Sequence, residues 1–341
     1  MKKIVTFGEI MMRLSPAGNL RLVQASDLGI TFSGAEANVA ASLSIFGLDG
    51  CFVTALPDNE IGDSCLSFIR KYGVNVSKIK RAKGRLGIYF VEKGAAQRPS
   101  KVIYDRADSL ISKAKVGDFD WDDIFEGAGW FHFTGITPAL GKGVADLTLE
   151  ACKKAKEKGI KVSCDLNYRN KLWSKEEARK VMTSLMPYVD VLIANEEDAK
   201  DVFGIEAENT NIAYGKLDLE GYKSVACQLI DRFGFEKVAI TLRESLSASH
   251  NLWSALLTDG KDYCFSKKYD IFPIVDRVGG GDSFGAGLIY SFVNGYKLQE
   301  AVEFAVAASC LKHSIEGDFN LVSVNEVKAL VNGAGSGRVQ R

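Results

Sequence analysis

One stretch decides how this chain folds around a ligand: Val275-Asp276-Arg277-Val278-Gly279-Gly280-Gly281-Asp282-Ser283-Phe284. Its three glycines leave consecutive backbone N–H groups unshielded by side chains. The apolar residues that follow recur at helical spacing: Phe284, Leu288, Ile289, Phe292 and Val293. This spacing predicts a helix that begins at the glycine turn. Because a helix N-terminus carries partial positive charge and free N–H donors, the sequence predicts an anion pocket here.

Asp282 follows the glycines at the mouth of the predicted pocket. A carboxylate there is badly placed to bind a phosphate but well placed to orient a hydroxyl that attacks one. The pair therefore indicates phosphoryl transfer from a nucleotide to an alcohol. The alternative is a common glycine-rich turn in which Asp282 only caps the helix. Beside a helix N-terminus we do not expect a raised pKa for Asp282, so orientation should matter more than basicity.

The composition is that of an ordinary folded protein. The 341 residues can hold one large α/β domain with an accessory element, or two domains. Apolar residues make up 46% and charged residues 25%. Lysine plus arginine and aspartate plus glutamate number 43 each, so no nucleic acid or anionic membrane is expected as a partner. No apolar run has the length of a transmembrane helix.

The cysteines and histidines are scattered along the chain. Seven cysteines and three histidines form neither a C-x-x-C pair nor a zinc-ligand spacing. An odd number of isolated cysteines is best explained by reduced structural thiols. We therefore expect a cytoplasmic protein.

Short β-rich runs alternate with helical patterns. The expected core strands are 4–7, 51–55, 130–134, 160–165, 189–194 and 237–242. The expected helices are 35–46, 61–72, 142–157, 175–186, 222–233, 282–294 and 299–313. This alternation predicts βαβ units and an α/β fold with a doubly wound, mostly parallel sheet. Ligands of such sheets bind beyond the carboxyl ends of the strands.

Two segments, 10–33 and 84–106, carry short strand-like runs without intervening helices. Within the second, 86–91 and 101–104 predict a hairpin. We interpret both segments as a small β lid over one end of the main sheet, which would exclude water on closure. Alternatively, these strands only pack at the periphery of the domain, or they form the contact of a homo-oligomer through the lid. The remaining expectations are one domain over residues 1–331, a polar surface insertion at 206–221 and a flexible tail at 332–341.

Two further motifs place polar residues at the start or end of expected elements. Gly34 lets a ligand approach the backbone closely, and Asn38, one turn into the next helix, offers the donor and acceptor that a polyol needs. Arg169 follows the strand at 160–165 and could fork onto a carboxylate or phosphate. The alternatives are a helix entry with a buried asparagine and a solvated surface arginine.

The lid and the end of a later strand supply two more candidate groups. Tyr104 and Arg106 end the second lid strand, with Tyr89 on its partner, and they suit an acidic, hydroxylated substrate. An ordinary cross-strand aromatic pair is the alternative. Asn195 and Asp198 follow the strand at 189–194, where an amide and carboxylates could organise hydrated magnesium. Acidic capping of the next helix is the alternative there.

Together and in this order, these motifs resemble those of the ribokinase-like (PfkB-type) carbohydrate kinase family, from residue 2 to about residue 331. The strongest marks are 34–38 and 276–282, where Gly280 replaces the alanine of that family's common Gly-Ala-Gly-Asp. Within the family the chain is most similar to the 2-keto-3-deoxygluconate kinases. The stretches that carry this similarity are Asp165-Leu166-Asn167-Tyr168-Arg169, Leu172-Trp173, Tyr104-Asp105-Arg106, Thr241-Leu242-Arg243-Glu244-Ser245 and Gly317-Asp318.

The resemblance implies ATP-dependent phosphorylation of the 6-hydroxyl of 2-keto-3-deoxygluconate, with Mg²⁺, and leaves a monovalent cation requirement open. It implies that Asp282 is the base and that Gly279, Gly280 and Gly281 form an anion hole. The residues implied around the sugar acid are Gly34, Asn38, Tyr89, Tyr104, Arg106, Arg169 and Asp318. Those implied at the nucleotide are Asn167, Asn195, Thr241, Arg243, Ser245, Gly279 and Gly281, with Asp198 at the metal and 308–312 beside the base.

Two departures from the family pattern concern the nucleotide side. Asp198 stands where the family often has glutamate, which puts the magnesium assignment in question. Thr241-Leu242-Arg243 stands where many members have Lys-Leu-Gly, so the nucleotide loop at 243–247 is expected to differ in shape.

Three alternative functions stand beside the kinase prediction. The nearest is a kinase of the same fold for a neutral ketohexose such as fructose, or for another sugar acid. A non-catalytic sugar sensor is disfavoured by the intact Asp282. A Rossmann dehydrogenase is disfavoured because no G-x-G-x-x-G follows the first strand.

Overall fold

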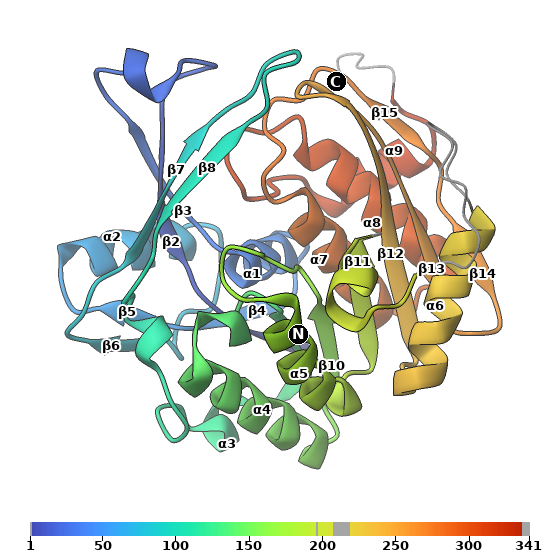
Figure 1. Ribbon diagram of the computed structural model, residues 1–341, viewed down its shortest axis with the longest axis horizontal. Coiled ribbons are helices and arrows are strands. Elements are labelled where there is room, and N and C mark those ends of the chain that lie inside the picture. The colour runs from blue at the N-terminus through green and yellow to red at the C-terminus, as the bar shows by residue number, and fades with distance from the viewer. Residues whose placement is uncertain (1, 196, 207–218, 336–341) are drawn as a thin grey trace.

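The computed structural model describes residues 2–195, 197–206 and 219–335, and a nine-stranded sheet forms its centre (Figure 1). The strand order is β14-β13-β12-β11-β10-β9-β1-β4, and β15 pairs with β13. Neighbours from β4 to β12 run parallel, whereas the pairs made by β13 are antiparallel. The predicted α/β fold with a mostly parallel sheet is thereby confirmed.

Every predicted core strand is present. The strands of the main sheet are β1 (Lys3–Phe7), β4 (Asp49–Val53), β9 (Ala128–Thr134), β10 (Lys161–Asp165), β11 (Val191–Asn195), β12 (Lys237–Ser247), β13 (His250–Thr258), β14 (Tyr263–Phe265) and β15 (Tyr269–Ile271). The loop predicted at 243–247 is wrong, because this segment continues β12. Arg243 lies opposite Trp253 of β13, so an antiparallel partner satisfies the backbone of a polar stretch that reads as a loop.

Helices cover both faces of the main sheet (Figure 1). They are α1 (Ala35–Ile45), α2 (Glu60–Arg70), α3 (Trp121–Ile124), α4 (Lys142–Glu157), α5 (Lys175–Leu185), α6 (Leu219–Phe233), α7 (Gly280–Val293), α8 (Leu298–Lys312) and α9 (Val324–Val331). Successive side chains of a strand point to opposite faces. In β1, Val5 therefore joins the cluster containing Leu147 of α4, whereas Ile4 packs with Val39 of α1 and Ile289 of α7.

Single helical turns connect several of these elements. They are η1 (Leu22–Gln24), η2 (Ile111–Lys113), η3 (Pro138–Leu140), η4 (Met186–Tyr188) and the π-helical turn η5 (Ala199–Phe203). The last of these begins at Ala199, shortly after β11 ends at Asn195.

The two lid segments build a second, four-stranded sheet that projects from the main body (Figure 1). In spatial order its strands are β3 (Gly29–Ser33), β2 (Met11–Ser15), β7 (Gly87–Glu92) and β8 (Lys101–Asp105). The predicted hairpin is present: Tyr89 lies opposite Tyr104, with ring centroids 6.1 Å apart. We call this sheet the lid, and its closure remains a prediction. A short parallel pair, β5 (Ala55–Pro57) and β6 (Lys80–Ala82), lies apart from both sheets.

Three smaller expectations concern thiols, membranes and surface segments. All seven cysteines are unpaired, as reduced structural thiols require. Across the described ranges, none of the helices combines the length and the apolar character needed to cross a bilayer. Most of the predicted insertion, residues 207–218, and the end of the predicted tail, 336–341, lie outside the described residues.

Candidate active site

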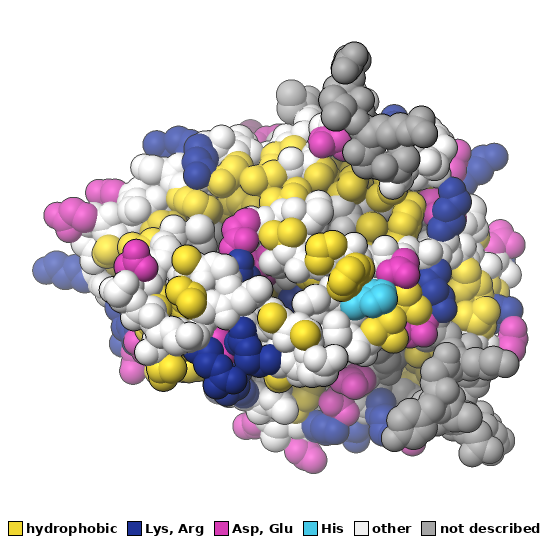
Figure 2. Space-filling model, turned by 90° about the horizontal axis from the view of Figure 1, so that it is seen from above, with side chains coloured by type: hydrophobic (Ala, Val, Ile, Leu, Met, Phe, Trp, Pro, Cys, Tyr) yellow, Lys and Arg dark blue, Asp and Glu magenta, His cyan; other side chains and the backbone are white. Residues whose placement is uncertain are grey.

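A cavity of about 510 Å³ lies between the lid and the carboxyl ends of the parallel strands. In Figure 2 the hollow on this side of the molecule has both acidic and basic side chains at its floor. The predicted site residues that line it are Gly34, Asn38, Tyr89, Tyr104, Arg106, Asn167, Arg169, Asn195, Asp198, Thr241, Arg243, Gly279, Gly280, Gly281, Asp282 and Asp318. Ser245 does not line the cavity, because it lies further along the extended β12.

Asp282 and Asn38 form one hydrogen-bonded unit. Asp282 lies in the first turn of α7, and Asn38 of α1 donates from Nδ2 to its Oδ2 at 2.6 Å. Burial raises the pKa of Asp282 to about 6, although the hydrogen bond from Asn38 lowers it. The expectation of an unraised pKa is therefore wrong, because the lost hydration of the carboxylate outweighs the helix N-terminus.

The glycine turn is shaped by its neighbours. Gly279 has φ of 83°, a left-handed conformation, and a Cβ there would lie 2.0 Å from the carbonyl oxygen of Asp318. At Gly281 nothing lies within 4 Å of a Cβ position, so the backbone is open to a ligand. The N–H groups of a helix's first turn have no intrahelical acceptor, and the turn therefore has the geometry of an anion site.

Packing against a histidine that is distant in the sequence requires glycine at position 280. A Cβ at Gly280 would lie 2.8 Å from Cε1 of His313. His313 is buried, and its Nδ1 is 2.7 Å from the carbonyl oxygen of Ser309, whose Oγ donates to the carbonyl oxygen of Gly280 at 2.7 Å. The alanine common in the family would collide with this ring, so the sequence departure follows from local packing.

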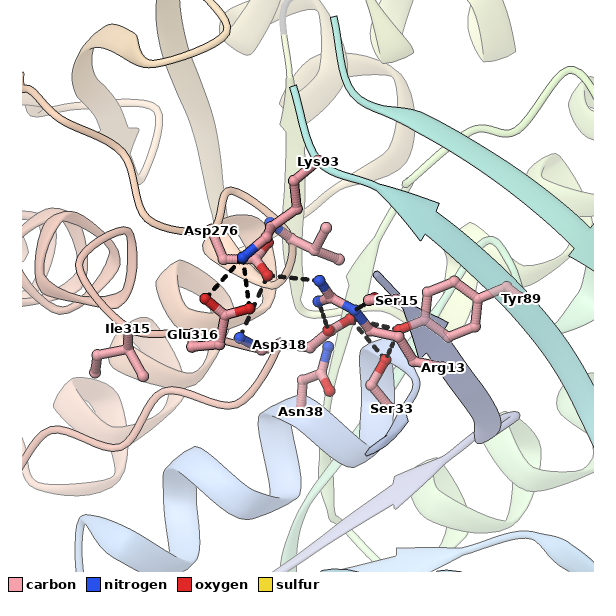
Figure 3. A network of polar contacts seen from close by, with 12 residues as sticks. Arg13, Ser15, Ser33, Asn38, Tyr89, Lys93, Asp276, Ile315, Glu316 and Asp318 are labelled. Carbon is pink, nitrogen blue, oxygen red and sulfur yellow. Dashed lines mark hydrogen bonds and ion pairs between the residues drawn. The ribbon is translucent and has the colours of Figure 1, made fainter. Parts of the chain in front are cut away.

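Arg13 of β2 lies at the centre of a buried ion-pair network (Figure 3). Its Nη2 is 2.6 Å from Oδ2 of Asp276, and its Nη1 contacts Oδ1 of Asp318. The three side chains are at most 2% exposed. Asp276 begins the glycine motif, so Arg13 ties the lid to that motif. Arg13 is not among the residues that the sequence marks, because no local pattern indicates that an arginine in a short strand is buried.

Asp318 and Tyr89 line the cavity, but their polar atoms bond each other. Tyr89 donates its hydroxyl to Oδ2 of Asp318 at 2.8 Å, and Ser33 donates to the same oxygen at 2.6 Å. Arg13 donates to the other carboxylate oxygen, so Asp318 accepts hydrogen bonds from side chains of three lid strands, β2, β3 and β7. It therefore holds three lid strands, and its contact with a sugar acid remains a prediction.

The two predicted substrate arginines differ in their surroundings. Arg106 is paired with the buried Glu9, which also accepts from Oγ of Ser109 at 2.6 Å. Arg169 is exposed, and its guanidinium donates to the carbonyl oxygen of Tyr168 at 3.0 Å. In the described part of the chain no carboxylate lies within 4.0 Å of Arg169. Arg169 is thus the arginine with charge available for an acidic ligand.

Asp198 precedes the π-helical turn η5, but its side chain makes no capping hydrogen bond to that turn. It is buried and accepts the backbone N–H of Asn195 and of Tyr168, each at 3.2 Å. Burial raises its pKa to about 6. Asp165, at the end of β10, has a pKa raised by burial, by Asp198 and by Asp282. No group of three metal-binding side chains occurs among the residues described, so the metal role of Asp198 remains a prediction.

The side of the cavity expected to hold the nucleotide carries a second arginine, Arg277, which is not among the predicted site residues. Arg277 donates from Nη2 to the carbonyl oxygens of Ser247 and Ala248, at 3.1 and 2.8 Å. Burial lowers the pKa of Arg277, and the nearby charge of Arg243 lowers it further. Two neighbouring guanidinium groups beside the glycine turn favour an anionic ligand.

The helix segment expected beside the base, 308–312, is not part of the cavity lining, and its contact with the base remains a prediction. Ala308 and Lys312, at its two ends, are fully buried and do not line the cavity. The cavity thus combines a buried carboxylate held by Asn38, an open glycine turn and an exposed arginine, Arg169, which are the features expected of a carbohydrate kinase.

The comparisons with known proteins agree with this geometry. A model described as the pfkB family of carbohydrate kinases matches residues 1–319, so the chain belongs to that family. The crystal structure of a 2-dehydro-3-deoxygluconokinase from Thermotoga maritima is similar, with a TM-score of 0.93 and 53% identity, over 97% of this chain and 98% of that chain.

Two curated relatives also align over nearly the whole chain. A 2-dehydro-3-deoxygalactonokinase from Haloferax volcanii is 34% identical over 336 residues, 98% of each chain. A 2-dehydro-3-deoxygluconokinase from Bacillus subtilis is 28% identical over 330 residues, 94% of this chain and 93% of the relative. The resemblance drawn from the motifs is thereby confirmed.

Replacing Arg13 with leucine should strongly destabilise the protein. The change leaves Asp276 and Asp318 buried without their cation, which costs about 3–5 kcal/mol. Urea unfolding measures this loss. Arg85→Leu is the control, because its pair with Asp105 is exposed to solvent and its loss should barely change the free energy of unfolding. Equal losses for both variants would contradict the assigned importance of Arg13.

Proposed function

We propose that the protein transfers the γ-phosphate of ATP to the 6-hydroxyl of 2-keto-3-deoxygluconate, also called 2-dehydro-3-deoxygluconate. The product is 2-keto-3-deoxy-6-phosphogluconate. The observation that carries the proposal is the Asp282 carboxylate, held by Asn38 beside an open glycine turn in the main cavity. The names of the Thermotoga maritima and Bacillus subtilis proteins support the choice of sugar acid.

Asp282 would orient the sugar hydroxyl and accept its proton. With a pKa of about 6 this carboxylate is ionised at neutral pH and more basic than an ordinary aspartate. The N–H groups at the start of α7 would stabilise charge on the transferred phosphoryl group, as preorganised donors do in such reactions. Closure of the lid over the cavity would exclude water and suppress hydrolysis of ATP.

The acidic residues at the ends of β10 and β11 fit Mg²⁺. Asp165 and Asp198 repel each other, which raises the pKa of Asp165 beyond the effect of burial, and a divalent cation would relieve this repulsion. Mg²⁺ commonly keeps several waters and needs only one or two carboxylates besides the phosphates. Bound there, it would neutralise charge on the phosphates.

We also propose a cytoplasmic location and an assembly of copies through the lid. Seven unpaired thiols support a reducing, cytoplasmic environment. Apolar side chains of the lid, such as Ile30 and Ile103, are exposed. They support association of copies of the chain through the lid.

The pH dependence should report Asp282. Since the ionised form is the active one, kcat/KM should fall about tenfold per pH unit below about pH 6 and level off above it. In the wild type the hydrogen bond from Asn38 lowers the pKa of Asp282. Asn38→Leu removes this bond, so the pKa of Asp282 should rise and the inflection should move to higher pH. Protonation of ATP itself affects the pH profiles of both proteins equally. A difference between the wild-type and Asn38→Leu profiles therefore reports the titration of Asp282. Coincident profiles would remove Asp282 from the proton transfer.

Asp282→Asn is the companion variant. It preserves shape but cannot accept the proton, so turnover should fall by about 10² to 10⁴ with near-normal folding. A coupled assay of ADP release measures turnover, and circular dichroism checks the fold. Full turnover in this variant would contradict the mechanism.

A kinase for a neutral ketohexose is the alternative, and Arg169 distinguishes the two. Arg169→Leu should raise KM for 2-keto-3-deoxygluconate about tenfold or more, because the sugar carboxylate loses its charge partner. KM for fructose should stay unchanged. Lys171→Leu, in the same loop but outside the cavity lining, is the matched control. Equal effects on both sugars, or faster turnover of fructose, would favour the ketohexose reading.

A further inference from the structure

Lys312, the last residue of α8, is fully buried and has no role in the proposed reaction. Its Nζ donates to the carbonyl oxygen of Asp276 at 3.1 Å and to that of Ile315 at 3.3 Å. Over the ranges that the structure describes, no carboxylate lies within 4.0 Å of this ammonium group. A buried lysine that is coordinated by main-chain carbonyls, without a paired carboxylate, is unusual.

The two carbonyl groups belong to the junction on which the glycine turn rests. The carbonyl oxygen of His313, the residue after Lys312, accepts from the backbone N–H of Val275 at 2.8 Å and of Asp276 at 3.3 Å. Gly317 donates its N–H to Oδ2 of Asp276 at 3.3 Å. Figure 3 places Asp276, Ile315 and Asp318 around this junction. The ammonium group therefore bridges the start of the motif and the turn that supports it.

The charges that face Lys312 favour a cation at this point. Asp276, Asp318 and Asp282 act on it with negative charge, and Arg13 with positive charge. Burial lowers the pKa of Lys312, and the three carboxylates oppose that effect. Convergent carbonyl oxygens next to carboxylates are also the ligands that a small monovalent cation prefers.

We propose that the Lys312 ammonium group is a tethered monovalent cation that holds the carbonyls of Asp276 and Ile315 together beneath the glycine turn. The turn then keeps its phosphate-binding shape without added K⁺ or Na⁺. Lys312 is thus a positioning residue, which acts through the turn and contacts no substrate. The inference rests on the proposed function, because it assumes that the turn binds phosphates.

The test compares the wild type with Lys312→Met in buffers whose only monovalent cation is tetramethylammonium, which is too large for the junction. Wild-type kcat should change by less than about twofold when K⁺ or NH₄⁺ is added. Lys312→Met keeps the length of the side chain but loses its charge, so kcat should fall about tenfold or more. K⁺ or NH₄⁺ should then restore most of the lost activity in a saturable manner.

Lys93→Met is the matched control. Lys93 pairs with Glu316, next to Ile315, at 2.6 Å, but it does not reach the carbonyls beneath the glycine turn. Its removal should create no cation dependence. If Lys312 only fills space, kcat of Lys312→Met should stay low whether or not K⁺ or NH₄⁺ is added. This result would overturn the inference. Strong activation of the wild type by K⁺ would overturn it without any variant.

ADP binding, measured by calorimetry, separates this inference from the choice of sugar. ADP affinity should fall in Lys312→Met and recover with K⁺ whichever sugar is phosphorylated. If the wild type binds no ADP, the proposed kinase function fails instead. Should Lys312→Met not fold in tetramethylammonium, Lys312→Ala is expressed and melted with and without K⁺ and methylammonium. A melting temperature that neither cation raises would overturn the inference.

Discussion

The paired contact of Arg13 with Asp276 and Asp318 is the interaction on which the site depends. It joins a lid strand, the first residue of the glycine motif and the turn before α9, three parts that are far apart in the sequence. All three side chains are buried, so removing any one of them leaves an unpaired charge in the protein interior. The pair therefore fixes the lid's attachment at the place where the glycine motif begins.

The cavity holds more carboxylates than its own cations neutralise. Asp165, Asp198 and Asp282 each have a pKa raised mainly by burial. Arg169 lowers the pKa of all three from the cavity rim. Such a balance makes Asp282 more basic, and it leaves room for a divalent cation between phosphates and protein. Burial thus sets the proton affinity of Asp282 more than the helix N-terminus does.

The fold and most of the cavity lining could be predicted from the sequence because their signals are local. Alternating strands and helices indicated the parallel sheet, and the spacing around Gly34, Asn38 and Asp282 marked residues that line one cavity. Arg13, Glu9 and Lys312 could not be found in this way. Arg13 and Glu9 pair with residues 97 or more positions away, and Lys312 reaches a carbonyl group 36 residues away. No local sequence pattern reports such burial.

The sequence by itself determined the glycine turn, the helix that follows it and the carboxylate at its first turn, because backbone freedom and helical periodicity act over a few residues. Only the tertiary structure decided the pKa of Asp282, the need for glycine at position 280 against His313, and the pairing of Arg106 with Glu9. These depend on desolvation and on contacts that exist only once the lid and α8 have packed against the sheet.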